Sequence, residues 1–323
     1  MSLLDLLAAD ERALVREGPP PKGSDAMRAK LTDDRFSDPE WIFERKLDGI
    51  RCIAVRDGGP VRLWSRNDLS LDGRYPELAE ALAAEAAPRF AIDGEVVAFE
   101  RGRTSFARLT QRGERSVAVY LYVFDVLWLE GFDLRALPLR ARKRILRRAF
   151  GFHGHVRLTP HRNVDGEAYF TEACRRGWEG LIAKRADSTY SSRRSDDWLK
   201  FKCEHGQELV VGGYTAPRGS RTRFGALLLG VYEGDGLRYA GKVGTGFGHA
   251  ALDTIGDRLE ALRADRSPFA DPDAIRERDV TWVRPELVAQ VGFTEWTRDG
   301  RLRHPRFQGL RDDKAARDVV REG

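Results

Sequence analysis

The chain has 323 residues, of which 41% are hydrophobic and 33% charged, and its 55 Lys and Arg residues against 50 Asp and Glu residues give a formal net charge of +5. This composition excludes a disordered chain, and no apolar stretch reaches the ~20 residues of a membrane-spanning helix. Three cysteines without a CxxC pair, and an N-terminus without the pattern of a secretion signal, favour a reduced, cytoplasmic compartment.

The first two-thirds of the chain predicts a domain of mixed helices and strands. A short amphipathic helix is expected before the proline-rich segment 19–23, and Asp-Gly turns separate the first strands that follow it. The expected strands span residues 41–46, 52–56, 61–64, 90–99, 117–127, 181–184 and 198–202, and the expected helices span residues 75–87, 139–150 and 165–176.

After about residue 205 the sequence changes to short β runs separated by glycine-rich turns. Three runs precede a helix expected at 249–263, and two more runs follow at 280–284 and 287–296. Short strands of this number with one inserted helix predict a small barrel such as an OB-fold. We therefore expect an α+β protein of two domains, residues 1–204 and residues 205–323.

Lysine is rare in this chain, because only nine of the 55 basic residues are lysine and 46 are arginine. One of the nine, Lys46, ends a predicted strand within the segment Glu44-Arg45-Lys46-Leu47-Asp48-Gly49-Ile50-Arg51. A lysine at such a junction becomes nucleophilic when it is desolvated and placed beside cations, because its pKa then falls. Taken alone, however, the segment favours a hairpin turn with a solvated lysine.

Further segments that can carry chemistry follow in order along the chain. Within a hydrophobic strand the carboxylates of Asp93 and Glu95 are costly unless each binds a partner. Taken alone, Glu95 or Glu179 favours a buried ion pair, and Phe124 favours core packing. The segments are Ser65-Arg66-Asn67, Asp93-Gly94-Glu95, Phe124-Asp125, Glu179-Gly180-Leu181-Ile182-Ala183-Lys184, Trp198-Leu199-Lys200-Phe201-Lys202 and Arg311-Asp312-Asp313-Lys314.

This ordered set of motifs resembles that of the ATP-dependent DNA ligases of the covalent nucleotidyltransferase superfamily, over nearly the whole chain from about residue 40 to 314. A finer resemblance, over residues 186–233, 237–247 and 303–314, is to the ligase domain of the bacterial end-joining ligases. The resemblance implies an adenylation (nucleotidyltransferase) domain of antiparallel sheets with flanking helices, followed by an OB-fold domain.

The resemblance also implies a role for each matching residue. Lys46 is similar to the lysine that attacks the α-phosphate of ATP, which releases pyrophosphate and leaves lysyl-AMP. Glu44 matches the position that meets the adenine amino group, and Phe124 the ring that stacks on adenine. Glu95 and Glu179 match the metal-facing carboxylates, and Glu95 also meets the ribose. The implied phosphate and ribose contacts are Arg51, Arg66, Lys184, Arg194, Lys200 and Lys202, and the implied pyrophosphate contacts are Arg311, Asp313 and Lys314.

The implied cofactors are ATP and Mg²⁺ (or Mn²⁺), since two carboxylates suit a hard cation. After adenylation of Lys46, AMP passes to the 5′-phosphate of a nick and the 3′-hydroxyl seals the strand. Fixed cations are expected to stabilise the transition state and to favour the neutral amine. Because the pyrophosphate contacts lie on the second domain, a hinge is expected near residues 202–207, with Gly206 as a candidate.

Two clusters of basic residues are candidates for contact with DNA phosphates. The predicted helix at 139–150 carries six cations in nine residues, from Arg140 to Arg148, and a solvated helix face is the equal alternative. In the second domain, Arg218, Arg221 and Arg223 follow a Pro-Gly turn.

The implied substrate is nicked double-stranded DNA, and the implied role is DNA repair by end joining, by a monomer in the bacterial cytoplasm with no membrane contact. Only about 40 residues precede the first motif, so the separate DNA-encircling domain of larger ligases is not expected, nor are fused polymerase or phosphoesterase domains. A Ku-like end-binding protein or separate end-processing enzymes are then the implied partners. Two alternatives remain, namely an RNA ligase or a GTP-using capping enzyme with the same covalent chemistry, and a non-enzymatic OB-fold nucleic-acid-binding module.

Overall fold

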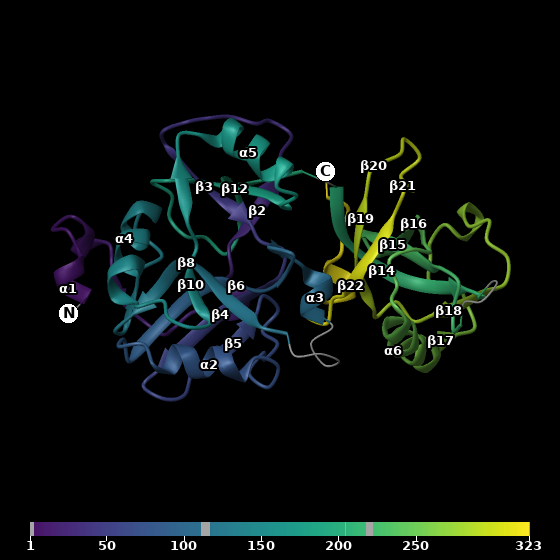
Figure 1. Ribbon diagram of the computed structural model, residues 1–323, viewed down its shortest axis with the longest axis horizontal. Coiled ribbons are helices and arrows are strands. Elements are labelled where there is room, and N and C mark those ends of the chain that lie inside the picture. The colour runs from purple at the N-terminus through teal and green to yellow at the C-terminus, as the bar shows by residue number, and fades with distance from the viewer. Residues whose placement is uncertain (1–2, 111–116, 204, 218–221, 323) are drawn as a thin grey trace. The chain divides into compact units, whose positions relative to one another are not determined.

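The computed structural model describes residues 3–110, 117–203, 205–217 and 222–322. The chain divides into two compact units, Met1–Cys203 and Glu204–Gly323, which are seen in Figure 1. Each unit has a large apolar core of its own. Among the described residues, no helix is long and apolar enough to cross a membrane.

Among its described residues, the first unit contains two main sheets and five α-helices. The strands of the larger sheet are β1 (Arg16–Glu17), β4 (Ile50–Asp57), β5 (Arg62–Ser65), β6 (Arg89–Glu100), β7 (Arg103–Thr104), β8 (Val119–Leu129), β9 (Phe132–Asp133) and β10 (Val156–Leu158). The strands of the smaller sheet are β2 (Arg28–Leu31), β3 (Trp41–Lys46), β11 (His161–Asn163), β12 (Gly180–Arg185) and β13 (Arg194–Lys202). The helices are α1 (Leu3–Leu6), α2 (Pro76–Ala83), α3 (Phe106–Thr110), α4 (Leu139–Ala149) and α5 (Gly166–Arg175).

The order of the larger sheet is β1-β9-β8-β6-β4-β5, with β10 beside β8 and β7 beside β6, and the order of the smaller sheet is β11-β3-β12-β13-β2. Most pairs are antiparallel, as expected, but β10 runs parallel to β8 and β13 runs parallel to β2.

The larger sheet turns one face to an apolar core and the other face toward the smaller sheet. Val96 and Ala98 on β6 and Leu121 on β8 lie in that core, together with side chains of α2 and α4. Side chains alternate along a strand, so Glu95 and Tyr122, which lie opposite each other in the β6–β8 register, project from the other face.

The smaller sheet alternates in the same way. Phe43 on β3, Leu181 and Ala183 on β12, and Phe201 on β13 pack together with Tyr169 of α5. The even-numbered side chains of the same strands therefore point away from α5, toward the larger sheet. These side chains include Glu44, Lys46, Lys184, Lys200 and Lys202.

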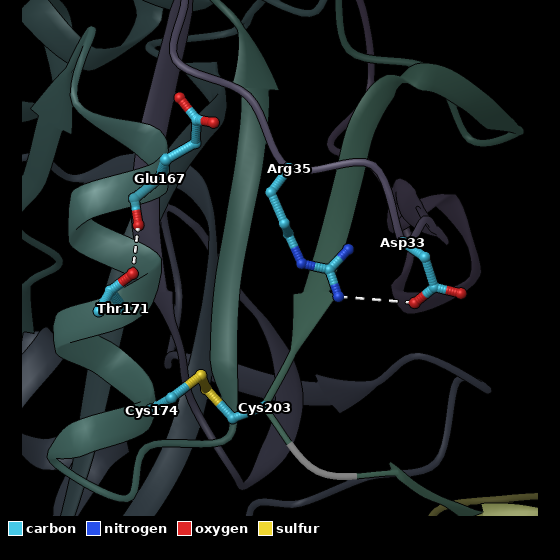
Figure 2. The surroundings of a disulfide bond; sticks show 6 residues. All are labelled: Asp33, Arg35, Glu167, Thr171, Cys174 and Cys203. Atoms are coloured by element: carbon cyan, nitrogen blue, oxygen red, sulfur yellow. Dashed lines mark hydrogen bonds and ion pairs between the residues drawn. A yellow bond between two sulfur atoms is a disulfide. The ribbon is translucent and has the colours of Figure 1, made fainter.

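A disulfide joins Cys174, in the last turn of α5, to Cys203, directly after β13 (Figure 2). The sequence indicated a reduced compartment and suggested no pairing, because the two cysteines are 29 residues apart. They meet because α5 packs on the sheet that contains β13, which brings the end of the helix beside the end of the strand. The third cysteine, Cys52, is free and buried.

The second unit carries a seven-stranded sheet in the order β16-β15-β14-β18-β17, with β19 between β14 and β22. Its strands are β14 (His205–Thr215), β15 (Leu227–Glu233), β16 (Gly236–Val243), β17 (Arg263–Ala264), β18 (Val280–Val283), β19 (Val288–Phe293) and β22 (Arg306–Leu310). Helix α6 (His249–Ala261) follows β16, and β20 (Glu295–Trp296) pairs with β21 (Leu302–Arg303).

The structure differs from the sequence prediction at the N-terminus and in strands that were not predicted, such as β2, β10, β11 and β22. The N-terminal helix covers only Leu3–Leu6, and part of its expected span, Arg16–Glu17, instead forms β1 against β9. Strand β22 was not predicted because its sequence is polar, yet it pairs with the buried strand β19. The hinge near residues 202–207 stays a prediction, and its candidate Gly206 lies near the start of β14, opposite Gly292.

Candidate active site

The segment from Lys46 to Arg51 crosses from one sheet to the other. Lys46 ends β3 of the smaller sheet, and Arg51 lies in β4 of the larger sheet. The crossing passes close to β6 at Gly49, where an added Cβ would lie 2.2 Å from the carbonyl oxygen of Val96. Only glycine fits this approach without a shift of the backbone, so the Asp-Gly turn places Lys46 between the two sheets.

Lys46 forms an ion pair with Glu179, whose Oε1 lies 2.5 Å from Lys46 Nζ. Burial by itself lowers the pKa of Lys46, but the carboxylate of Glu179, with those of Glu95 and Asp48, outweighs burial and raises the pKa above the ordinary lysine value. The groups nearest to the amine are thus carboxylates, whereas the sequence led us to expect cations that favour the neutral amine. The raised pKa favours the ammonium form of Lys46, which must lose a proton before it can act as a nucleophile.

Glu179 directly precedes β12, whose first residue, Gly180, lies opposite Lys46 in register. Gly180 has φ +148°, and an added Cβ would lie 1.8 Å from the carbonyl oxygen of Phe201, so the glycine after Glu179 is a steric requirement. The second carboxylate oxygen of Glu179, Oε2, is buried and has no hydrogen-bond partner among the described residues. With Glu95 projecting from the facing sheet, the two carboxylates fit a Mg²⁺ ion that takes its remaining ligands from phosphate oxygens and water.

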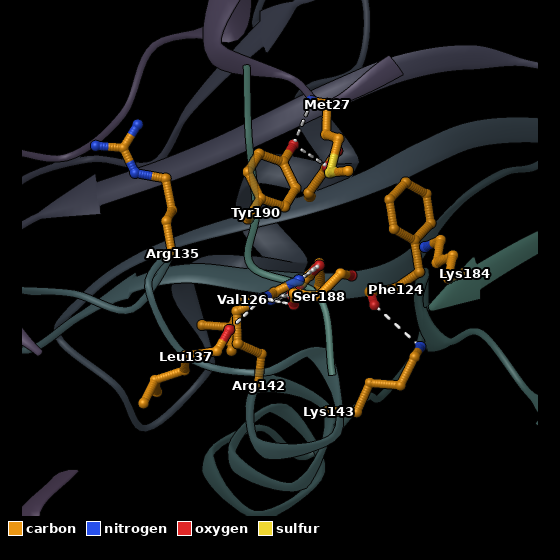
Figure 3. Close-up of polar contacts among 12 residues, drawn as sticks. Met27, Phe124, Val126, Arg135, Leu137, Arg142, Lys143, Lys184, Ser188 and Tyr190 are labelled. Atoms are coloured by element: carbon orange, nitrogen blue, oxygen red, sulfur yellow. Dashed lines mark hydrogen bonds and ion pairs between the residues drawn. The ribbon is translucent and has the colours of Figure 1, made fainter. Parts of the chain in front are cut away.

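Glu44, two residues before Lys46, is held by two lysines. Lys143 of α4 donates a hydrogen bond to Glu44 Oε1. It also donates to the carbonyl oxygen of Phe124 at 3.1 Å, as Figure 3 shows. Lys184 Nζ lies 2.7 Å from Glu44 Oε2. Burial opposes ionisation of Glu44, but the charges of the two lysines outweigh it and lower its pKa. Burial lowers the pKa of Lys184 to about 8, although Glu44 partly counters this effect.

Phe124 lies beside this cluster with only 8% of its surface exposed. Lys184 Nζ is 4.0 Å from the centroid of the Phe124 ring, and the Arg51 guanidinium carbon is 4.7 Å from it. Trp198 meets the same ring edge-on at 6.2 Å. An aromatic ring surrounded by cations and beside an anionic acceptor forms a site for a flat, electron-rich heterocycle with an amino group.

Arg51 forms a bidentate ion pair with Asp93, with hydrogen bonds of 2.5 and 2.6 Å. The resemblance had instead assigned Arg51 to the ribose and phosphates of the nucleotide. Asp93 is fully buried, and its Oδ2 also accepts a hydrogen bond from Tyr190 at 2.6 Å. Tyr190 in turn accepts a hydrogen bond from the backbone N–H of Met27 (Figure 3). Asp93 therefore has its partners within the protein, while the chemical role of its neighbour Glu95 stays a prediction.

The remaining predicted residues of the first unit are placed as follows. Lys200 and Lys202 on β13 lie opposite Ile182 and Gly180 of β12, which in turn lie opposite Glu44 and Lys46 of β3. Arg66 is half-buried and directly follows β5. The last residue of β5, Ser65, lies opposite Cys52 on β4, which places Arg66 near Arg51. Arg194 is exposed at the other end of β13, about 20 Å from Lys200 along the strand. The fold therefore brings together the predicted residues of this unit except Arg194.

Three of the six cations of the basic helix α4 fit neither of its sequence interpretations, whereas Arg140, Arg147 and Arg148 remain exposed. Arg142 is fully buried and forms a bidentate ion pair with Asp125 at 2.8 and 3.0 Å. Lys143 is buried against Glu44, and Arg144 pairs with Glu11. These three cations are thus tied into the unit, because the helix packs on β8 along this face, and the exposed Arg140 donates to the carbonyl oxygen of Pro39 at 2.8 Å.

The second basic cluster is only partly described. Arg218 and Arg221 lie outside the described residues. Arg223 pairs with Asp257, and its Nε lies 3.4 Å from Asp253.

The predicted motif of the second unit forms a compact cluster. Arg311 binds Asp313 through two hydrogen bonds of 2.8 Å. Lys314 Nζ lies 3.1 Å from Glu208 Oε1, and Arg311 also approaches this oxygen at 3.8 Å. Glu208 was missed from the sequence, because nothing in the hydrophobic run of β14 indicated a partner for the motif about 100 residues later.

Comparison with known proteins places this geometry in a family. The family model "ATP dependent DNA ligase domain" matches residues 26–202, and "ATP dependent DNA ligase C terminal region" matches residues 220–314. The multifunctional non-homologous end joining protein LigD of Pseudomonas aeruginosa is 42% identical over 292 residues, which cover 88% of this chain and 35% of the relative. The LigD of Mycolicibacterium smegmatis is 40% identical over 293 residues, which cover 89% of this chain and 38% of the relative. The chain thus spans little more than a third of the length of these relatives.

Solved structures agree with this placement. A mycobacterial DNA ligase D complexed with ATP and MES is similar with a TM-score of 0.66 and 36% identity, covering 93% of this chain and 99% of that one. The ligase domain of Mycobacterium tuberculosis LigD is similar with a TM-score of 0.50 at the same identity and coverage. These likenesses confirm the predicted α+β class, with an adenylation domain and an OB-fold domain. The chain therefore belongs to the ATP-dependent DNA ligases and is of the LigD ligase-domain type.

Proposed function

We propose that this chain seals nicks in double-stranded DNA through a covalent lysyl-AMP intermediate, using ATP. The observation that carries the proposal is the position of Lys46, which lies between the two sheets of one unit, paired with Glu179. Its strand also carries Glu44, which Lys143 and Lys184 hold beside Phe124. A nucleophile, a purine site and a pair of carboxylates thus occupy one face.

In the first step, Lys46 Nζ attacks the α-phosphorus of ATP, the N–P bond forms, and the bond to the bridging oxygen breaks to release pyrophosphate. Glu179 Oε1, at 2.5 Å from Nζ, is in position to accept the proton that the ammonium group must lose. Lys200 and Lys202 stabilise the negative charge that develops on the phosphates. When bound by Glu95 and Glu179, Mg²⁺ supplies further neutralisation of phosphate charge.

In the second step, the 5′-phosphate of the nick attacks the same phosphorus, and Lys46 leaves as an amine that regains its proton. In the third step, the 3′-hydroxyl attacks the adenylated 5′-phosphorus, which forms the phosphodiester bond and releases AMP. Arg66 and the lysines of β13 are the cations that we assign to the nick phosphate. Positioning and charge neutralisation are the main contributions that a protein makes to such transfers.

We infer a role in DNA repair by end joining from the LigD relatives, with Mg²⁺ or Mn²⁺ as the metal. A Ku-like end-binding protein or separate end-processing enzymes are the partners that this role requires. We expect a monomer that acts in the cytoplasm.

The chemistry is tested by mass spectrometry of the purified protein. Incubation with ATP and Mg²⁺ should add the mass of one AMP, and pyrophosphate should remove it. Lys46→Ala should abolish the adduct, because no other side chain can replace the amine at this position. Lys30→Ala, which changes an exposed lysine paired with Asp196 in the same unit, should leave the adduct unchanged. An adduct that persists in Lys46→Ala would disprove the assignment of the nucleophile.

Two substrate comparisons separate this function from its alternatives. Labelled ATP against labelled GTP distinguishes an adenylating ligase from a capping enzyme. Nicked DNA against nicked RNA distinguishes a DNA ligase from an RNA ligase. A binding module without catalysis would form no covalent nucleotide with either triphosphate.

A further inference from the structure

A pocket of about 460 Å³ lies on the larger sheet of the first unit, apart from the nucleotide residues named above. Three aromatic side chains line it, namely Phe99 of β6 and Tyr120 and Tyr122 of β8, together with Arg108 of α3 and Arg157 of β10. These five residues form what we call the aromatic groove. None of the described residues that line it carries a negative charge.

The aromatic groove continues the face of the sheet that carries the active site. In the β6–β8 register Glu95 lies opposite Tyr122, and Val97 lies opposite Tyr120. Side chains two residues apart share a face, so Phe99 extends the row that begins at Glu95. On β10, Arg157 lies opposite Tyr122. The groove therefore begins beside the predicted metal-facing carboxylate and leads away from it along the strands.

The groove combines rings with fixed positive charge. Phe99 meets Tyr120 edge-on with centroids 5.9 Å apart and Tyr122 with centroids 6.0 Å apart, so the three rings hold one another in place. The guanidinium carbon of Arg157 lies 5.5 Å from the Tyr120 ring. The rings and Arg157 are half-buried rather than packed in the core. Aromatic rings interleaved with arginines suit nucleic acid, because bases and sugars pack on rings while phosphates bind guanidinium groups.

We propose that the aromatic groove binds the DNA strand that runs up to the nick. Arg108 and Arg157 contact two of its backbone phosphates, and the rings of Phe99 and Tyr120 pack against its sugars and bases. This placement follows from the continuity of the groove with the catalytic face and from its charge, which complements a polyanion. The inference rests on the proposed ligase function and adds to it a subsite for the DNA substrate.

The test uses the full chain with three variants, Arg108→Gln/Arg157→Gln, Tyr120→Ala and the control Arg176→Gln, which removes an exposed arginine paired with Glu172 at the end of α5. The dissociation constant for nicked duplex DNA is measured over a range of salt concentrations. The double arginine variant should bind roughly 10-fold more weakly. The slope of log K against log salt should become less steep by about two, since each lost phosphate contact reduces its magnitude by about 0.9. Tyr120→Ala should bind roughly 10-fold more weakly with an unchanged slope, since stacking carries no counterion release.

Self-adenylation with ATP, which needs no DNA, shows whether each variant has folded and should stay within twofold of the parent protein. Normal DNA affinity and salt slope in the double arginine variant, with self-adenylation intact, would overturn the proposal. The same result is expected if the groove instead receives a protein partner. Failure of the proposed function itself is seen separately, as the absence of any AMP adduct in the parent protein.

Discussion

The carboxylate of Glu44 is held in one place and one charge state by two lysines, and this has a consequence for nucleotide choice. An ionised carboxylate only accepts hydrogen bonds, so it favours the 6-amino group of adenine and repels the 6-oxygen of guanine. Lys143 binds both Glu44 and the carbonyl oxygen of Phe124. One ammonium group therefore positions both the acceptor and the ring that we assign to the base.

We expect Lys143→Met to weaken recognition of the adenine amino group more than it slows the chemistry. The apparent KM for ATP in self-adenylation should rise by roughly 10-fold, because the loss of about one charge-assisted hydrogen bond has an effect of this size. The change in kcat should be smaller. Lys143→Arg should recover part of the loss, and Arg148→Met, on the exposed side of the same helix, should have no effect.

Purine riboside triphosphate, which lacks the 6-amino group, separates positioning from general damage. In the parent protein this substrate should be clearly worse than ATP, and in Lys143→Met the two substrates should become nearly equal. If the variant weakens both substrates by the same factor, Lys143 supports the fold and does not position Glu44.

At the scale of elements, helix α4 is attached to the larger sheet by a buried charge pair as well as by apolar packing. Arg142 and Asp125 are both fully buried, and Arg142 also donates to the carbonyl oxygens of Leu137 and Ser188. Removal of one partner leaves the other charge buried and unpaired, which costs about 3–5 kcal/mol.

We therefore expect Arg142→Met to lower the free energy of unfolding of the first unit by about 3–5 kcal/mol, measured by urea denaturation. The double variant Asp125→Asn/Arg142→Met should be more stable than Arg142→Met alone, since no uncompensated charge remains. Arg148→Met serves as the control for loss of positive charge on the same helix. Equal stability of the single and double variants would show that the two charges are not coupled.

The sequence predicted most of the strands that carry the site but not the packing of α4. Period-two alternation placed Lys200 and Lys202 on one face of β13, but the site residues themselves were chosen by their resemblance to the motifs of the ligase family. The cations of α4 could not be assigned, because a run of arginines has the same appearance whether it faces water, DNA or a buried carboxylate. Glu208 was missed, and no partner was assigned to Asp93, for a related reason, since Lys314 and Arg51 are brought to them only by tertiary contacts.

At the scale of the whole molecule, the chemistry assigned to ATP is divided between two units. Lys46 and its carboxylates belong to the first unit, while Arg311, Asp313 and Lys314 belong to the second. The second cluster is internally paired, with Lys314 bound to Glu208. A cation that acts on pyrophosphate is needed only while pyrophosphate is present, which is in the first of the three steps.

Lys314→Ala should therefore separate the steps of the reaction. Self-adenylation should fall by roughly 100-fold or more, the effect of removing one group that stabilises developing charge. Sealing of a nick that already carries 5′-AMP should stay within a few-fold of the parent rate, because that substrate contains no pyrophosphate. Lys242→Ala, which changes an exposed lysine of the same unit paired with Glu277, should leave both rates unchanged. An equal loss in both assays would place Lys314 in DNA binding or in the stability of the second unit, and would remove the reason to assign the cluster to the leaving group.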